Sequence, residues 1–222
     1  MLRSLINGAS FESTLIAILI NIPIALLALS VHEAAHGYVS NKLGDPTAKN
    51  LGRLTINPIK HLDPIGFICM VLFGIGWANP VPINTRHFKK PRRDMALSAA
   101  AGPVSNLLLA VVFALLLKGF LLLPDAIYAS LGIFAQIIIM FLIQAISLNV
   151  FFAIFNLLPV PPFDGSRILY VFLPPKYYFG VMKYERYICI GFMLLLFLGV
   201  LDPILNLLSS SVEAIIYKTI VF

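Results

Sequence analysis

Charged residues and cysteines are scarce in this sequence, and each shortage excludes a class of protein. Asp, Glu, Lys and Arg make up 12% of the 222 residues, whereas a soluble domain carries about 25%. With 59% hydrophobic residues and a mean hydropathy of +0.93, the chain is expected to be an integral membrane protein. Cys69 and Cys189 form no CxxC motif, which excludes a disulfide framework and a zinc knuckle. No continuous basic face with interleaved aromatic residues occurs, so nucleic-acid binding is not expected.

Four apolar segments are long enough to cross a bilayer, which takes about 20 residues. They are residues 14–36, 95–117, 131–158 and 187–208, the last of which is interrupted by Asp202-Pro203. We therefore expect an all-α polytopic membrane protein, a bundle of about four to six transmembrane helices.

A fifth apolar stretch, residues 64–78, contains Gly66, Gly74 and Gly76 and is too short for a comfortable crossing. If it returns to the side on which it begins, thirteen of the sixteen Lys and Arg residues lie on one side of the membrane. A full crossing would divide them ten against six. The positive-inside rule favours re-entry and places the basic loops in the cytosol. We expect a re-entrant or short β-containing segment between the first two spans.

An HEAAH sequence, His32 to His36, closes the first apolar segment. An ionisable residue near the centre of a membrane helix costs about 2.5–3.5 kcal/mol or more, so such residues are usually functional. On a helix, residues i and i+4 lie about 40° apart and about 6 Å along the axis. Both imidazoles can therefore reach one metal ion. Glu33 is rotated by about 100° and can accept a proton from a water at the metal without displacing a ligand.

A catalytic zinc site normally takes three protein ligands, so a third ligand is expected at the same membrane depth. Asp164 in the motif NLLPVPPFDG is the candidate, because three prolines there must break the helix that begins near residue 131. Broken backbone at membrane depth is tolerated only when it is buried in protein or lines a polar cavity. In the re-entrant topology, His32, His36 and Asp164 all fall at the cytosolic ends of their helices.

Other interpretations stay open from these residues alone. The HEAAH sequence could be two packed histidines and a glutamate at a helix end. Asp164 could be a turn residue before Gly165, which is common chemistry. His61 and His87 are rival third ligands, although each has polar and basic neighbours that are typical of a loop histidine.

Asparagines within the apolar segments are further candidates, since an intramembrane amide should be hydrogen-bonded. Asn106 follows a run of small residues at 96–102, which we expect to pack against the HEAAH helix. Asn149 and Asn156 are seven residues apart and share a helix face. They either line a polar path toward Asp164 or bond to a neighbouring helix.

Residues 79–94 combine three prolines with a cluster of Lys and Arg. The segment could be a gate, or a strand edge that binds an extended substrate. The basic cluster itself is better explained as a topology anchor that meets anionic lipid.

HEAAH at the end of one apolar helix and NLLPVPPFDG after a later one together resemble the site-2 protease family of intramembrane zinc metalloproteases. The stretch AAGPVSN at 100–106 looks like that family's third element. GDPTAK at 44–49, with NPIKHLDP at 57–64, is similar to compact prokaryotic members. The match runs from about residue 28 to 170, in the family's order. The chain departs from many members in reading DGSR at 164–167 in place of a DGG-like end, and it shows no PDZ or CBS module.

This resemblance implies a site built around one Zn2+ ion, with the ligands His32, His36 and Asp164. Glu33 would be the catalytic base, Asn106 would help hold the substrate strand or the oxyanion, and Asn156 would support the site. The implied activity is intramembrane endopeptidase cleavage of transmembrane protein substrates, in regulated intramembrane proteolysis. The implied location is the plasma (inner) membrane of a prokaryote, with a multi-pass chain in the lipid bilayer and the active site near the cytosolic face.

We expect one membrane-embedded domain over residues 1–222, with a catalytic core at about 14–170 and a C-terminal helical region at 176–222. Two functions of other classes are the alternatives. A metal transporter would use polar intramembrane residues as an ion path, but the expected ligands cluster at one face. A non-catalytic membrane adaptor could keep a metal site, but binding alone does not need Glu33.

Overall fold

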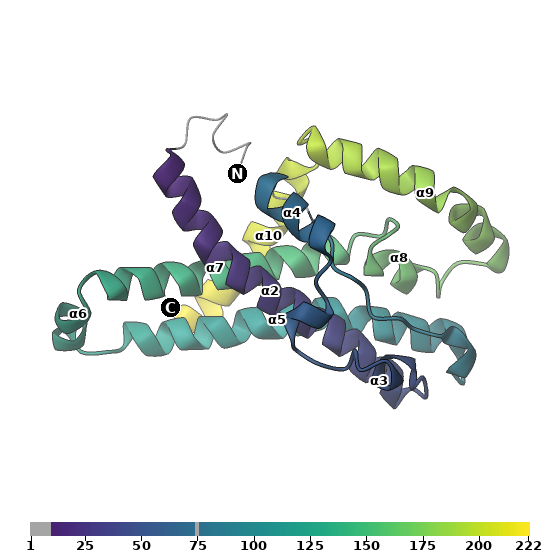
Figure 1. Cartoon of the computed structure of the whole chain (residues 1–222), viewed down its shortest axis with the longest axis horizontal. Coiled ribbons are helices and arrows are strands. Elements are labelled where there is room, and N and C mark those ends of the chain that lie inside the picture. The colour runs from purple at the N-terminus through teal and green to yellow at the C-terminus, as the bar shows by residue number, and fades with distance from the viewer. Residues whose placement is uncertain (1–9, 74–75) are drawn as a thin grey trace.

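The computed structural model describes residues 10–73 and 76–222 of the chain (Figure 1). Four helices in these ranges are long and apolar enough to cross a membrane. They are α2 (Phe11–Lys42), α5 (Pro91–Leu121), α7 (Ile133–Asn156) and α10 (Asp202–Ile216), the last extended by the π-helical turn η3 (Tyr217–Val221). The expected all-α polytopic membrane protein is confirmed.

The first three predicted spans match α2, α5 and α7, but the fourth, residues 187–208, is wrong. The chain instead ends helix α9 (Pro175–Phe197) and turns through Gly199, whose φ is 73°. Helix α10 then begins at Asp202, with Pro203 in its first turn. Because proline fits the first turn of a helix and breaks its interior, Asp202-Pro203 starts a helix and does not interrupt one. The fourth span is therefore Asp202–Val221.

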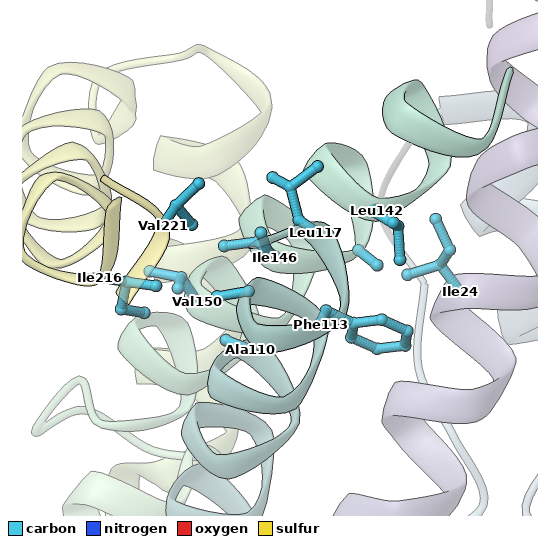
Figure 2. Packing of buried hydrophobic residues seen from close by; sticks show 11 residues of the cluster. Ile24, Ala110, Phe113, Leu117, Leu142, Ile146, Val150, Ile216 and Val221 are labelled. Carbon is cyan, nitrogen blue, oxygen red and sulfur yellow. The ribbon is translucent and has the colours of Figure 1, made fainter. Parts of the chain in front are cut away.

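Helix α5 packs along α7 and against α2 (Figure 1). Alanines at the contacts are fully buried, and their small side chains let the helix backbones approach closely. Such close packing holds helices together in lipid, where no hydrophobic effect drives their association. The apolar cluster between the helices joins α2, α5, α7 and the C-terminal turn through Ile24, Ala110, Phe113, Leu117, Leu142, Ile146, Val150, Ile216 and Val221 (Figure 2). Large apolar side chains also cover the outward faces, as a lipid-facing surface requires; examples are Leu108, Leu115, Ile133 and Leu207.

The segment between the first two spans forms a hairpin built around α4 (Pro64–Phe73). Its ten residues are about 15 Å long, half of the roughly 30 Å hydrocarbon thickness. Leu62 and Ala78 form an antiparallel β-bridge, and the N–H of Asn79 donates to the carbonyl of His61 at 2.7 Å. The segment therefore returns to its starting point, as expected of a re-entrant segment with short β pairing. Gly74 lies outside the described residues.

Short elements connect the spans and carry the loops that surround the site. On the α2 side these are α3 (Thr47–Asn50), η1 (Pro58–Lys60) and η2 (Thr85–His87). Helix α6 (Asp125–Leu131) joins α5 to α7, and α8 (Asp164–Leu169) follows the break after α7. Helix α8 packs against α5, which brings the residues after α7 back to the bundle.

Candidate metal centre

Helix α2 presents two imidazoles on one buried face. His32 and His36 are 4% and 6% exposed, and their ring centroids lie 4.6 Å apart. The i, i+4 spacing produces this arrangement, because residues four apart on a helix are neighbours on its surface. Two nitrogen donors therefore face the same space beside α5.

Asp164 reaches the two histidines from a position 132 residues after His32. Helix α7 ends at Asn156, the proline-rich stretch 157–163 turns the chain, and Asp164 begins α8. Its Oδ2 lies 3.1 Å from Nε2 of His32 and 3.2 Å from Nε2 of His36. One candidate ligand atom from each of the three residues lies within 4.8 Å of the others, and all three residues are buried. The three residues singled out from the sequence are therefore brought together.

The other ring nitrogen of each histidine is engaged by helix α5. His36 Nδ1 donates to the backbone carbonyl of Ser98 at 2.7 Å, because a carbonyl only accepts. His32 Nδ1 lies 2.6 Å from Oδ1 of Asn106. Such outer partners fix the orientation and tautomer of metal-binding histidines. Both Nε2 atoms are left facing Asp164.

Gly102 shows how closely α5 passes the three candidate ligands. A Cβ at this position would lie 2.5 Å from Nε2 of both His32 and His36. The space beside the two nitrogens therefore exists only because residue 102 has no side chain. Two imidazole nitrogens and a carboxylate oxygen are a donor set that zinc prefers, with a fourth position open for water. The residues present fit a zinc ion.

Asp164 has the charge that a metal ligand needs. An aspartate has an ordinary pKa of about 3.9 and is ionised at neutral pH, and a bound cation would favour the ionised form further.

Glu33 is half-buried beside the histidines, and its carboxylate contacts the backbone of the segment that follows α4. Oε2 of Glu33 accepts a hydrogen bond of 2.7 Å from the N–H of Val81. The sequence pattern gave no indication of this partner, because the two residues are 48 positions apart. The predicted catalytic base is thus fixed at one oxygen by the main chain.

Asn106 is completely buried between three helices. Besides contacting His32, its Nδ2 donates to Oδ1 of Asn149 at 3.1 Å and to the carbonyl of Ala28 at 3.3 Å. Asn156 lies at the end of α7, where its amide donates to the carbonyl of Phe152 one turn earlier. The roles suggested for both asparagines toward a substrate or the site remain predictions.

The rival histidines lie elsewhere. Nε2 of His61 is 2.7 Å from the carbonyl of Thr55, and Nδ1 of His87 is 2.9 Å from Oδ1 of Asp45. Neither belongs to the three-residue group that could hold a metal among the described residues. Asp164 is the third candidate ligand that the geometry favours.

Asp45, just beyond the end of α2, is a structural residue that the sequence reading missed. It is 0% exposed and accepts hydrogen bonds from Thr47, from the N–H of Asn84 and from His87. Burial alone would raise the pKa of Asp45, but these bonds outweigh burial and hold the pKa below its ordinary value. Asp45 thereby ties the end of the HEAAH helix to the far end of the segment that contacts Glu33.

Ser98 belongs to the run of small residues that was expected to pack against the HEAAH helix, but no role of its own was predicted for it. Its carbonyl accepts from His36, its hydroxyl lies 2.7 Å from that of Ser40, and the same hydroxyl donates to the carbonyl of His36 at 3.2 Å. The run of small residues at 96–102 was the available signal, since it predicted close packing of this helix on α2. The position of Ser98 within that contact could not be read from the run.

Comparisons with known proteins find a peptidase family and several relatives. The family model described as Peptidase family M50 matches residues 118–198. The relatives named "Putative zinc metalloprotease" include YwhC of Bacillus subtilis, Rip2 of Mycobacterium tuberculosis and MJ0611 of Methanocaldococcus jannaschii. YwhC is 45% identical over 185 residues, which cover 82% of this chain and 83% of YwhC.

The other two relatives are more distant. Rip2 is 31% identical over 187 residues, covering 82% of this chain and 66% of Rip2. MJ0611 is 33% identical over 106 residues, covering 47% of this chain and 49% of MJ0611. No solved structure matches the chain.

Proposed function

The chain belongs to peptidase family M50, the site-2 protease family, and we propose that it is an intramembrane zinc endopeptidase. Its substrates are membrane proteins, which it cleaves in or beside a transmembrane segment. The observation that carries the proposal is the convergence of His32, His36 and Asp164 within 4.8 Å, buried among apolar helices and next to Glu33. Ionisable groups at such a position are expensive and therefore functional.

His32 and His36 would hold one zinc ion through their Nε2 atoms and Asp164 through a carboxylate oxygen. When bound, zinc supplies Lewis acidity, which polarises the scissile carbonyl and lowers the pKa of a water toward about 7. Asn106 and Ser98 keep the Nδ1 atoms of the two histidines occupied, so each ring keeps its orientation.

Glu33 acts as the general base and then as the general acid. It accepts a proton from the attacking water and returns it to the amide nitrogen of the leaving peptide. The N–H of Val81 holds Oε2 of this carboxylate, which leaves Oε1 to exchange the proton. Because a positioned base contributes about 10²–10⁴-fold to a rate, loss of this carboxylate should nearly abolish cleavage.

The substrate must reach the site as an extended peptide, because a helical amide is hydrogen-bonded and shielded in lipid. Transmembrane segments that contain Gly or Pro, or that have already been trimmed elsewhere, should therefore be preferred. The gate or docking edge suggested for residues 79–94 stays a prediction, because hydrogen bonds with Glu33, Arg53 and Asp45 already engage the backbone at residues 79–84.

The proposed location is the plasma membrane of a prokaryote, with the site near the cytosolic face. The distribution of Lys and Arg supports this orientation, since thirteen of sixteen fall on the side where α2 ends. The corrected fourth span leaves this count unchanged, because Lys218 lies at its far end.

The test is Glu33→Gln in the full chain, reconstituted in liposomes with a single-span reporter that carries Gly and Pro in its span. The variant should bind as much zinc as the wild type and lose cleavage. Glu12→Gln, an exposed position in the first turn of the same helix, is the matched control and should cleave normally. Undiminished cleavage by Glu33→Gln would contradict the proposal, and zinc uptake into the liposomes without cleavage would support a transporter instead.

A further inference from the structure

Three buried side chains on three helices, Asn149, Asn106 and His32, form a series of hydrogen bonds that ends at the candidate metal centre. Asn149 on α7 and Asn106 on α5 are 1% and 0% exposed. Nδ2 of Asn149 donates to the carbonyl of Ala145 at 2.8 Å, and Nδ2 of Asn106 donates to Oδ1 of Asn149 at 3.1 Å. Oδ1 of Asn106 lies 2.6 Å from Nδ1 of His32.

The donor and acceptor roles in this series of hydrogen bonds follow from its last member, the carbonyl of Ala145. The carbonyl of Ala145 can only accept, so the amide nitrogen of Asn149 faces it and the amide oxygen faces Asn106. Asn106 must then present its nitrogen to Asn149, a choice that the carbonyl of Ala28 reinforces as a second acceptor. The oxygen of Asn106 is left for His32, whose Nδ1 has to donate.

We propose that Asn149 and Asn106 are positioning residues that fix the tautomer of His32. With the proton held on Nδ1, Nε2 carries the lone pair that a metal ligand requires. The inference rests on the proposed function, since it concerns the same metal centre. It assigns to Asn149 a role at a site that it does not touch.

The two histidines differ in a way that explains why a second asparagine is needed. Nδ1 of His36 donates to the backbone carbonyl of Ser98, which has no alternative orientation. Nδ1 of His32 faces a side-chain amide, which could turn its nitrogen toward the ring by rotating through about 180°. A nitrogen there would push the ring toward the tautomer whose Nε2 is protonated. Asn149 excludes that orientation, because its Oδ1 accepts a hydrogen bond from Nδ2 of Asn106.

The test measures zinc affinity of the purified full chain by competition with a chelator. Asn106→Leu removes the acceptor and should weaken zinc binding by about 10–100-fold, the usual effect of losing such an outer partner. Asn106→Asp keeps an acceptor and should bind more tightly than Asn106→Leu. Asn149→Leu should weaken binding by a smaller factor and alter the visible spectrum of the Co2+-substituted protein. The double variant Asn106→Leu/Asn149→Leu should bind no more weakly than Asn106→Leu alone.

Asn21→Leu is the matched control, because Asn21 lies on α2, the helix that carries His32, and its buried amide oxygen has no hydrogen-bond partner. It should bind zinc as the wild type does. Leucine resembles asparagine in shape and suits lipid, so both Leu variants are expected to insert. If Asn106→Leu does not fold, Asn149→Leu carries the test, since Asn149 lies outside the ligand set.

The relay is the series of hydrogen bonds from Asn149 through Asn106 to His32. Its failure can be told apart from failure of the proposed metal centre. If His36→Ala binds zinc as tightly as the wild type, the proposed metal centre is wrong. If His36→Ala loses zinc but Asn106→Leu and Asn149→Leu bind like the wild type, only the relay is overturned. Equal losses in Asn106→Leu and Asn106→Asp would also overturn it, because shape rather than hydrogen bonding would then matter.

Discussion

The backbone N–H of Val81 donates to Oε2 of Glu33 at 2.7 Å. Pro80 and Pro82 flank Val81 and have no N–H, so residue 81 supplies the donor of this short stretch. Arg53 holds the same stretch from the other side through the carbonyls of Asn79 and Pro80. The proposed base is therefore oriented by a piece of main chain that is itself fixed.

Val81→Pro should lower the turnover rate while zinc binding stays intact. The substitution removes the N–H, and losing a hydrogen bond to a charged group costs about 1.5–3 kcal/mol. Since about 1.4 kcal/mol corresponds to a tenfold change in rate, cleavage should fall by about 10- to 100-fold. Val81→Ala keeps the N–H and serves as the control. Equal rates for the two variants in the reporter assay would show that the bond does not orient Glu33.

Gly102→Ala should remove zinc from the purified protein. The new methyl group would lie 2.5 Å from Nε2 of both candidate histidine ligands, which cannot retreat because their Nδ1 atoms are bonded. Gly119→Ala on the same helix meets nothing within 4 Å and is the control. Elemental analysis should find about one zinc per control protein and much less in Gly102→Ala. Full zinc occupancy in both variants would show that the ion does not bind next to residue 102.

Gly165→Ala should displace Asp164 and weaken zinc binding by about tenfold or more. A Cβ here would overlap the backbone of Leu157 and Leu158, so the start of α8 would have to shift. Gly191→Ala adds the same methyl group in open space on α9. Chelator competition on the pair measures the effect, and matching affinities would mean that α8 tolerates the shift.

Asp45→Asn should lower thermal stability at neutral pH and have little effect in strong acid. The pKa of Asp45 in the folded protein lies below that of the unfolded chain, about 3.9. Its charge therefore stabilises the fold above that value, and the contribution is lost as the pH falls through the lower, folded pKa. Unfolding midpoints in detergent at pH 7 and in strong acid, at a pH below the folded pKa of Asp45, measure the difference, with exposed Asp125→Asn as control. A gap between variant and wild type that persists unchanged in acid would contradict this account.

The sequence alone predicted the features that depend on local spacing. The i, i+4 repeat placed His32 and His36 on one face, and the charges of the loops predicted that residues 64–78 return to their starting side. The fourth span was misplaced because residues 187–208 and 202–221 are both apolar, so composition could not choose between them. The turn at Gly199 separates α9 from the fourth span, and such a turn depends on backbone geometry that composition does not reveal.

Contacts between elements could not be predicted in the same way. Periodicity says which residues of a helix share a face, but it does not fix the rotation or the height of the neighbouring helix. The contact of Asn106 with His32 depends on both, as does the contact of Val81 with Glu33. The proline-rich motif before Asp164 predicted a break in the chain, whereas its docking against α5 became visible only in three dimensions.

The separation of 132 residues between His32 and Asp164 has a consequence for biosynthesis. A chain elongates at about 5–20 residues per second, so Asp164 is made about 7 to 26 seconds after His32. During that interval α2 carries its imidazoles without the carboxylate, and for the first part also without Asn106. The proposed three-ligand site cannot form until three of the four spans have been synthesised. Binding of a metal ion by all three ligands would therefore come only after α2, α5 and α7 have been made.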